Sequence, residues 1–227
     1  MISFPGPTSA LVTLPVAPDR VGVGRVLQLE RHVRSEFAGV RSTVPAFNRL
    51  LIEGAPDLWD PDRIRSRLAG AVQAVLEEEE PGMPDAAPVI LPVCYGSDMG
   101  PDLPALAGHR GMTPDEVSDL HAAGTYVVLA TGFAPGWAYL GDVDPRLEFP
   151  RHAEPRSRVP RGSVGIADRR TGVYPMDGPG GWQLIGRVPP ALFADASVRI
   201  ARFSVGGLVT FRPVSRADYD AEAGDPA

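Results

Sequence analysis

Four histidines are the side chains of this sequence best suited to proton transfer near neutral pH, because imidazole changes its charge there. His121 has the surroundings that most favour a functional role. It follows the apolar face of an expected helix and comes directly before an expected strand, so it could act as a proton carrier at the edge of a site. A structural histidine bonded to the backbone is the alternative.

Arginines crowd one short segment of an otherwise acidic chain, whose formal net charge is -6. They are Arg151, Arg156, Arg158 and Arg161. Guanidinium groups bind carboxylates and phosphates through paired hydrogen bonds, so the cluster could hold an anionic substrate. We take Arg156 as a substrate-binding candidate and Arg158 as a catalytic candidate. A solvated loop is the alternative.

Trp182 and Gln183 follow two consecutive glycines. The indole could form a flat apolar wall, and the neighbouring amide could donate to and accept from a polar substrate edge. Gln183 is therefore our third catalytic candidate, beside His121 and Arg158. The alternative is that Trp182 is a core residue that closes a barrel.

The composition excludes several kinds of chemistry. All 22 basic residues are arginine, so the chain has no lysine for a Schiff base or for a lysine-containing phosphate loop. A coding bias alone would also produce this composition. Cys94 is the one cysteine of the chain, and no HExxH or multiple-cysteine motif occurs. We expect neither a metal nor a disulfide in this chain.

Charge and hydropathy also limit the partners that we expect. The negative net charge argues against nucleic acid. No apolar run is long enough to cross a bilayer, and the first residues lack the pattern of a signal peptide. We expect a cytoplasmic protein that binds a small molecule, without nucleic acid or membrane as partner.

The first part of the chain predicts a small α+β domain over residues 1–84. Alternating residues predict a strand over 10–14, and FNRLLIEG predicts another over 47–54. Apolar residues at helical spacing predict a helix over 25–38, and Asp60-Pro61 predicts the start of a second helix. The segment 81–88 has three prolines and a glycine, which is typical of a linker.

The second part, residues 85–227, predicts a mainly β domain that forms a barrel or a compact sandwich. Strands are expected over 89–95 and 125–133, and a final strand or hairpin over 203–212. Thr113-Pro114 followed by Glu116 predicts a capped helix. The acidic end, 218–227, is expected to be loose.

The stretch from 132 to 186 contains ten glycines and seven prolines, a proportion typical of disorder. Apolar and aromatic blocks between these residues argue against disorder, since they can pack as short strands joined by tight turns. Glycine allows backbone angles closed to other residues, and proline stiffens loops. The stretch therefore predicts rigid loops around a binding site.

Four strings in this part of the chain resemble one known family. They are GFAPGWAYL (132–140), PRSRVPRGSVGIA (155–167), TGVYP (171–175) and PGGWQLIG (179–186). Their type and order are similar to the B subunits of 5-oxoprolinase, also described as allophanate hydrolase subunit 1, a family that includes the KipI histidine-kinase inhibitors. The resemblance is specific over residues 89–213 and looser before them.

The resemblance implies a cyclophilin-like β-barrel of the carboxyltransferase type after the α+β domain. It implies the A and C subunits of 5-oxoprolinase as partners, with ATP used through the assembled complex to hydrolyse 5-oxo-L-proline to L-glutamate. Within the family, the B and C subunits resemble two halves of a carboxyltransferase-type domain of urea carboxylase. Two departures are Trp137, where Phe is common, and Asp177-Gly178, where a small hydroxyl residue is frequent.

The family pattern, carried over to this sequence, also marks candidate substrate-binding residues. They are Phe133, Pro135, Gly136, Arg156, Ser163, Tyr174, Gly180, Gly181 and Trp182.

Our first functional hypothesis is a 5-oxoprolinase B subunit that is inactive alone, because the chain has no recognisable phosphate loop and no obvious catalytic triad. The alternatives are an allophanate hydrolase or urea carboxylase-type subunit 1, and a KipI-like inhibitor that binds a sensor histidine kinase.

Overall fold

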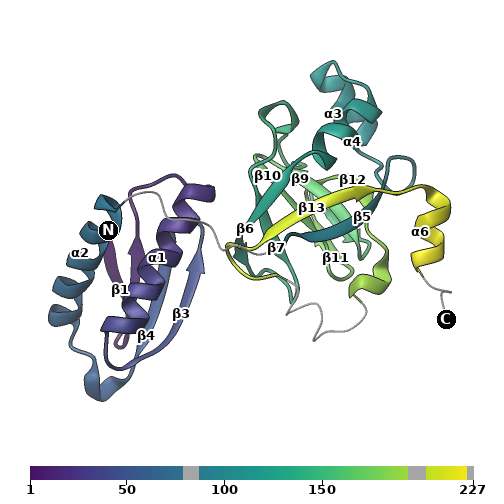
Figure 1. Ribbon diagram of the computed structural model, residues 1–227. Helices are drawn as coiled ribbons and strands as arrows, with labels where there is room; N and C mark the ends of the chain where they lie inside the picture. The colour runs from purple at the N-terminus through teal and green to yellow at the C-terminus, as the bar shows by residue number, and fades with distance from the viewer. Residues whose placement is uncertain (79–86, 194–202, 224–227) are drawn as a thin grey trace. The chain divides into compact units, whose positions relative to one another are not determined.

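The computed structural model describes residues 1–78, 87–193 and 203–223 (Figure 1). The chain divides into two compact units, Met1–Asp85 and Ala86–Ala227. Most of the expected linker, 81–88, lies outside the described residues. Among the described helices, none combines the length and apolar character needed to cross a membrane.

The first unit contains a four-stranded antiparallel sheet in the order β1-β2-β4-β3. The strands are β1 (Ile2–Gly6), β2 (Ser9–Thr13), β3 (Val40–Ala46) and β4 (Arg49–Gly54). Ala10 lies opposite Ile52 and Val12 opposite Leu50, so these four buried side chains share one face. The strands expected at 10–14 and 47–54 are confirmed, whereas β1 and β3 were not predicted.

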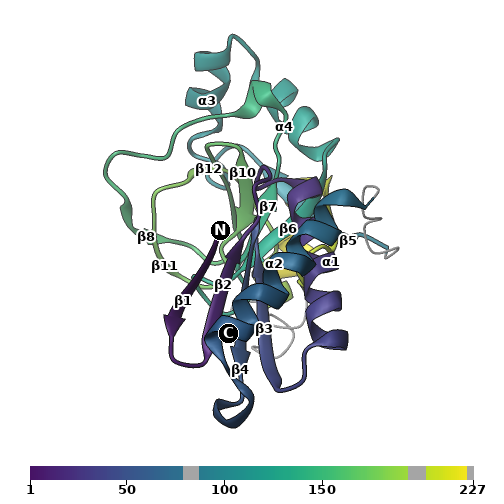
Figure 2. The same cartoon turned by 90° about the vertical axis from the view of Figure 1, so that its left-hand side faces the viewer.

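Two helices, α1 (Arg20–Glu36) and α2 (Pro61–Glu77), cover that face of the sheet (Figure 2). The side chains of Asp19 and Asp60 accept hydrogen bonds from backbone N–H groups in the first turn of each helix. The first helix begins before the expected residue 25. It includes Gly22, where a Cβ would clash with the Ala17 carbonyl.

The second unit is a closed barrel in the strand order β10-β7-β6-β13-β5-β12-β9. Its strands are β5 (Val89–Tyr95), β6 (Thr125–Thr131), β7 (Ala138–Gly141), β9 (Ser163–Ala167), β10 (Arg170–Val173), β12 (Gln183–Arg187) and β13 (Leu208–Pro213). β13 and β5 pair in parallel, which joins the first and last strands of the barrel. The predicted α+β fold with a barrel is confirmed.

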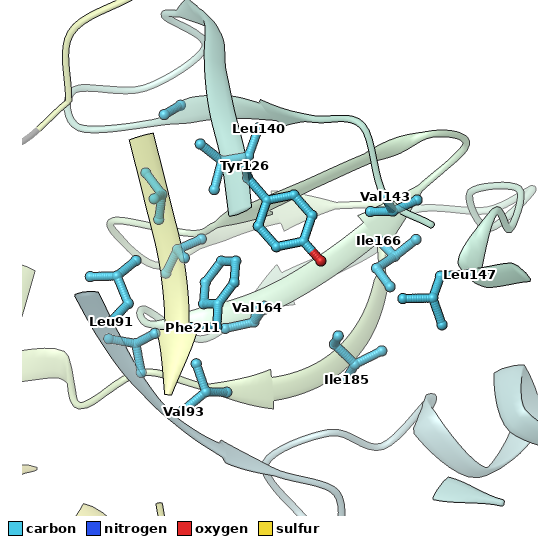
Figure 3. Packing of buried hydrophobic residues seen from close by; sticks show 14 of the residues in the cluster. Leu91, Val93, Tyr126, Leu140, Val143, Leu147, Val164, Ile166, Ile185 and Phe211 are labelled. Carbon is cyan, nitrogen blue, oxygen red and sulfur yellow. The ribbon is translucent and has the colours of Figure 1, made fainter. Parts of the chain in front are cut away.

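Side chains from all seven barrel strands contribute to its packed interior, part of which Figure 3 shows. Tyr126 and Phe211 lie among aliphatic side chains such as Leu91, Val164 and Ile185, and all five are at most 3% exposed. The barrel is therefore a packed core, and ligand sites have to lie outside its interior.

Two helices, α3 (Leu103–Arg110) and α4 (Pro114–Ala122), lie beside each other at one end of the barrel (Figures 1 and 2). The predicted capping box at the start of α4 is confirmed, since Thr113 and Glu116 exchange hydrogen bonds. The sequence did not predict α3.

Short elements complete the described part of the chain. They are a two-stranded sheet of β8 (Arg156–Val159) and β11 (Gly178–Gly180), the 3-10 helices η1 (Pro56–Leu58), η2 (Pro145–Leu147) and η3 (Pro190–Phe193), and α6 (Arg216–Ala223).

The loose end expected over 218–227 is wrong as far as residue 223, because α6 occupies it; residues 224–227 lie outside the described ranges. Asp218 and Ser215 exchange hydrogen bonds at the start of this helix, and Tyr219 packs against Cys94 and Met99.

Candidate functional site

A cavity of about 290 Å³ lies in the glycine- and proline-rich part of the chain. It is lined by Phe133, Trp137, Tyr139, Arg151, Pro155, Tyr174, Pro179, Gly180, Gly181 and Trp182. Five aromatic residues and two prolines give it an apolar wall, and Arg151 is the one charged residue among the described residues of the lining. A mainly apolar cavity with few polar groups is typical of a small-molecule site.

Trp137 organises the aromatic wall. Its ring centroid lies 4.9 Å from those of both Tyr174 and Trp182, 5.5 Å from that of Phe133 and 5.6 Å from that of Tyr139. All four pairs meet edge to face, an arrangement that aromatic rings favour. Because each ring fixes its neighbours, the wall is built before any ligand enters.

Phe133 is the exposed member of this group, at 68% relative exposure against 2% for Trp137. It has φ +81°, between Gly132 at +124° and Gly136 at +90°. A positive φ is unfavourable for a bulky residue, so this turn has to be held by its surroundings. Phe133 also lines a second cavity of about 430 Å³ together with Pro135 and Gly136.

Gly180 lets Tyr174 approach the backbone of the cavity wall. A Cβ at Gly180 would clash with the ring and hydroxyl of Tyr174, whereas a Cβ at Gly181 would find its nearest atom 3.6 Å away, at an ordinary contact distance. Burial raises the pKa of the Tyr174 phenol, opposed by a hydrogen bond with the Trp182 backbone and by the nearby charges of Arg151 and Arg156. The hydroxyl is therefore a neutral group at neutral pH.

Asp102 links the segment that contains Arg151 to the barrel through hydrogen bonds to both. Its buried carboxylate accepts from the Leu184 backbone N–H at 2.7 Å and from an Arg156 guanidinium nitrogen at 2.5 Å. Nε2 of His152 lies 3.3 Å from the same carboxylate. A buried carboxylate needs such partners, so Asp102 and its neighbours form one connected group.

Two further hydrogen bonds hold the same segment against the cavity wall. The Gln183 amide donates to the Pro150 carbonyl at 2.8 Å, and the His152 backbone N–H donates to the Gly181 carbonyl at 2.7 Å. Residues on both sides of Arg151 are therefore fixed to the strand end that forms the opposite wall.

The family model "Carboxyltransferase domain, subdomain C and D" matches residues 1–201 of this chain. The chain belongs to the carboxyltransferase subdomain C and D family.

A relative in this family is the 5-oxoprolinase B subunit of Bacillus subtilis (strain 168), which is 38% identical over 194 residues, 82% of this chain and 80% of the relative. Urea amidolyase of Saccharomyces cerevisiae (strain S288c) is 31% identical over 128 residues, which are 51% of this chain and 7% of that protein. The crystal structure of TTHA0988 aligns with a TM-score of 0.73 and 29% identity over 95% of this chain. The present chain spans 40% of that chain.

For this carboxyltransferase-family chain, the structure brings together five of the expected substrate-binding residues. Phe133, Tyr174, Gly180, Gly181 and Trp182 all line the aromatic cavity. Trp182 lines the cavity and is also packed into the protein, since its side chain is only 7% exposed and contacts Trp137. Their part in substrate binding stays a prediction.

The other expected binding residues lie elsewhere. Pro135 and Gly136 line the neighbouring cavity. Ser163 is fully buried in β9, and its hydroxyl has no hydrogen-bond partner among the described residues. Arg156 is paired with Asp102 and is not part of the cavity lining, so its part in substrate binding stays a prediction.

The arginine cluster does not converge on one point. Arg158, 77% exposed, pairs with Asp177 at 2.6 Å and is not part of the cavity lining. The backbone N–H of Arg161 also donates to Asp177, at 2.7 Å. Hydrogen bonds from Arg161 and Arg158 lower the pKa of the Asp177 carboxyl. Asp177, which departs from the family pattern, thus orders the turn beside Arg158.

His121 lies inside the core, not at the edge of a site, so its expected position is corrected. It is 0% exposed and packs against Phe211, with ring centroids 4.5 Å apart and ring planes tilted by 35°. Its Nδ1 lies 2.8 Å from the Tyr95 hydroxyl, and its Nε2 lies 2.9 Å from the Thr171 hydroxyl. Burial lowers the pKa of His121 to about 3. At neutral pH the imidazole is uncharged, and it is not part of the cavity lining.

Gln183 is buried, and its side-chain amide donates a hydrogen bond to the Pro150 carbonyl instead of lining the cavity. Sequence reasoning also missed Asp102 and did not single out Arg151 within its cluster. Asp102 stands two residues before Pro104 at the start of α3, and an acidic residue followed by proline is a helix-start signal that could have drawn attention to it.

Proposed function

We propose that this chain is the B subunit of an ATP-dependent 5-oxoprolinase, which acts with the A and C subunits in the cytoplasm to hydrolyse 5-oxo-L-proline to L-glutamate. The observation that carries the proposal is the 38% identity to the 5-oxoprolinase B subunit of Bacillus subtilis, over about four fifths of both chains. ATP is used through the complex. The aromatic cavity is the part of the shared substrate site contributed by this chain.

The lining of the cavity supports a role as one part of a larger enzyme. Among the described residues it includes a guanidinium and two phenols but no carboxylate, histidine, serine or cysteine. Opening an amide needs a nucleophile and a general acid or base. His121, Arg158 and Gln183 are not part of this lining, so the reacting groups of the proposed enzyme come from its partners.

The test is the ATP-dependent release of glutamate from 5-oxo-L-proline, with this chain alone, with the C subunit, and with the A and C subunits together. We expect release only from the full mixture. Release by the chain alone would contradict the proposed dependence on partners. No release from a mixture in which the chain has bound its partners would contradict the proposed substrate.

A urea or allophanate substrate is the second candidate, supported by the sequence similarity to urea amidolyase of Saccharomyces cerevisiae. The same mixture should then turn over urea or allophanate and leave 5-oxo-L-proline unchanged. An exposed apolar patch near Phe133 and Trp137 would favour the kinase-inhibitor alternative. Phe133 is 68% exposed but Trp137 is only 2% exposed, so the two residues do not form such a patch together.

A further inference from the structure

We infer that Arg151 and the aromatic cavity form an anion site on this chain alone, which binds a small carboxylate attached to a compact apolar ring. The choice of a five-membered ring as probe rests on the proposed function. Three observations support the site itself. The Arg151 guanidinium has no polar partner among the described residues, hydrogen bonds fix the backbone on both sides of Arg151, and aromatic rings line the cavity.

Arg151 differs from Arg156 and Arg158 in how its charge is used. Arg156 is paired with Asp102 and Arg158 with Asp177. The Arg151 guanidinium has no hydrogen bond and no ion pair with any residue in the described ranges, yet it lines the cavity. Within those ranges it is therefore a free cation at the mouth of an apolar site, in a chain whose net charge is negative.

Hydrogen bonds fix the backbone on both sides of Arg151, although the Arg151 side chain itself makes no hydrogen bond or ion pair within the described residues. Pro150 accepts a hydrogen bond from Gln183, and His152 donates one to Gly181 and contacts Asp102. Fixing the backbone beforehand reduces the entropy lost when a ligand binds. Asp102 and Gln183 are therefore positioning residues, which act through Arg151 and do not touch the ligand.

The charge near the cavity favours an anion. Asp102 is the carboxylate that contacts His152 in this segment, and Arg156 already neutralises it. Glu154, which belongs to the same segment, is exposed and is not part of the cavity lining. Arg151 and Arg156 both favour the ionised form of the Tyr174 phenol, which places their positive potential at the cavity wall. A carboxylate bound there would accept charge-assisted hydrogen bonds from Arg151.

The wall selects the rest of the ligand. Trp137, Trp182 and Tyr174 offer ring faces and edges within a volume of about 290 Å³, which suits a compact ring and excludes a long extended chain. Phe133, the exposed member of the aromatic group, adds a further ring to this wall. The predicted ligand is therefore a ring carboxylate, with its ring on the aromatic wall and its charge on Arg151.

Isothermal titration of the full chain, without other subunits, tests the inference with three probes: 5-oxo-L-proline, cyclopentanecarboxylate and 2-pyrrolidinone, which lacks the carboxylate. We expect the two carboxylates to bind, and 2-pyrrolidinone to bind about tenfold more weakly, since a hydrogen bond to a charged group is lost. Arg151→Gln should weaken both carboxylates about tenfold and leave 2-pyrrolidinone unchanged.

Two further variants separate charge from shape. Phe133→Ala should weaken all three probes, because it removes part of the wall and no charge. Arg169→Gln is the matched control: it removes an exposed guanidinium that pairs with Asp142 outside the cavity, and should change nothing. Unchanged carboxylate affinity in Arg151→Gln, with its fold verified by thermal melting, would overturn the inference.

The outcome also separates this inference from the proposed function. If the full mixture of subunits releases glutamate but the chain alone binds neither carboxylate, the inference fails and the function stands. If the chain binds carboxylates through Arg151 but the mixture releases no glutamate, the inference stands and the function fails.

Discussion

Protonation of the buried His121 should lower the free energy of unfolding of the barrel as the pH falls, whereas protonation of an exposed histidine should not. In the fold, Thr171 donates its hydroxyl proton to the Gly165 carbonyl at 3.0 Å, so it accepts from Nε2–H of His121. Nδ1 then accepts from the Tyr95 hydroxyl. Both ring nitrogens are satisfied in the neutral form, and the added charge of a second proton would be fully buried.

The size of the effect follows from the two pKa values of His121, about 3 in the fold and the ordinary 6.5, which we take for the unfolded chain. Because the folded value is the lower one, the unfolded chain takes up a proton first as the pH falls. The stability from neutral His121 is full above pH 6.5 and declines toward pH 3, by about 1.4 kcal/mol per pH unit. Between pH 7 and pH 5 the loss is about 2 kcal/mol.

Urea unfolding of wild type and His121→Gln, followed by the fluorescence of the barrel tryptophans, measures this loss. The variant is less stable at pH 7, but its free energy of unfolding should change about 2 kcal/mol less between pH 7 and pH 5 than that of wild type. His109→Gln, at an exposed histidine of the same unit, should retain the wild-type difference. Equal pH dependence in wild type and His121→Gln would refute the reasoning, as would a nuclear magnetic resonance titration of His121 near its ordinary pKa of 6.5.

Three further substitutions test the contacts around the site and the local folding signals. Asp102→Asn should lower the stability of the barrel by about 1 to 3 kcal/mol, because the carboxylate partners lose a charged acceptor; an unchanged melting temperature would contradict this. Gly180→Ala should destabilise the cavity wall by its clash with Tyr174, whereas Gly181→Ala, whose Cβ has ordinary contacts, should melt like wild type; equal melting of the two would exclude the clash. Thr113→Ala should cost about 1 kcal/mol through loss of the capping box, measured by urea unfolding; Thr113→Ser, which keeps a hydroxyl, should recover most of it.

The elements that the sequence predicted are those with a complete local signal. The second helix has Asp60-Pro61 at its start, and α4 has its capping box, so a few adjacent residues determine where each begins. Edge strands carry less information, because one side of each has no partner strand. β1 and β3 are the edges of their sheet, and both contain proline, which masks a strand pattern.

The start of α1 shows how a tertiary contact can reverse a local preference. Gly22 and Gly24 disfavour a helix when only propensity is considered. In the fold both are buried in α1, and Gly22 lies so close to the Ala17 carbonyl that a side chain would not fit. The need for close packing outweighs the propensity, and no pattern within the helix itself reveals that need.

The aromatic members of the site were predictable from residue type, and the arginines were not. Aromatic residues between glycines and prolines have few places to pack other than against one another. A guanidinium, in contrast, forms an ion pair with whichever carboxylate the fold brings close to it. Asp102 reaches Arg156 across 54 positions of sequence, and Asp177 reaches Arg158 across 19. Only the folded chain shows that Arg151 is the member left at the cavity without a partner among the described residues.

The polar groups around the cavity are used mainly to fix its shape. Asp102, Gln183 and the backbone of His152 all bind other parts of the chain, and none of the three is presented to a ligand. An enzyme that completes a difficult hydrolysis alone needs several polar groups directed at the reacting atoms. A rigid wall with a free cation at its mouth is instead what one member of a complex needs when it orients a substrate for groups supplied by a partner. The distribution of hydrogen bonds, rather than any single residue, therefore links this fold to the role that we propose.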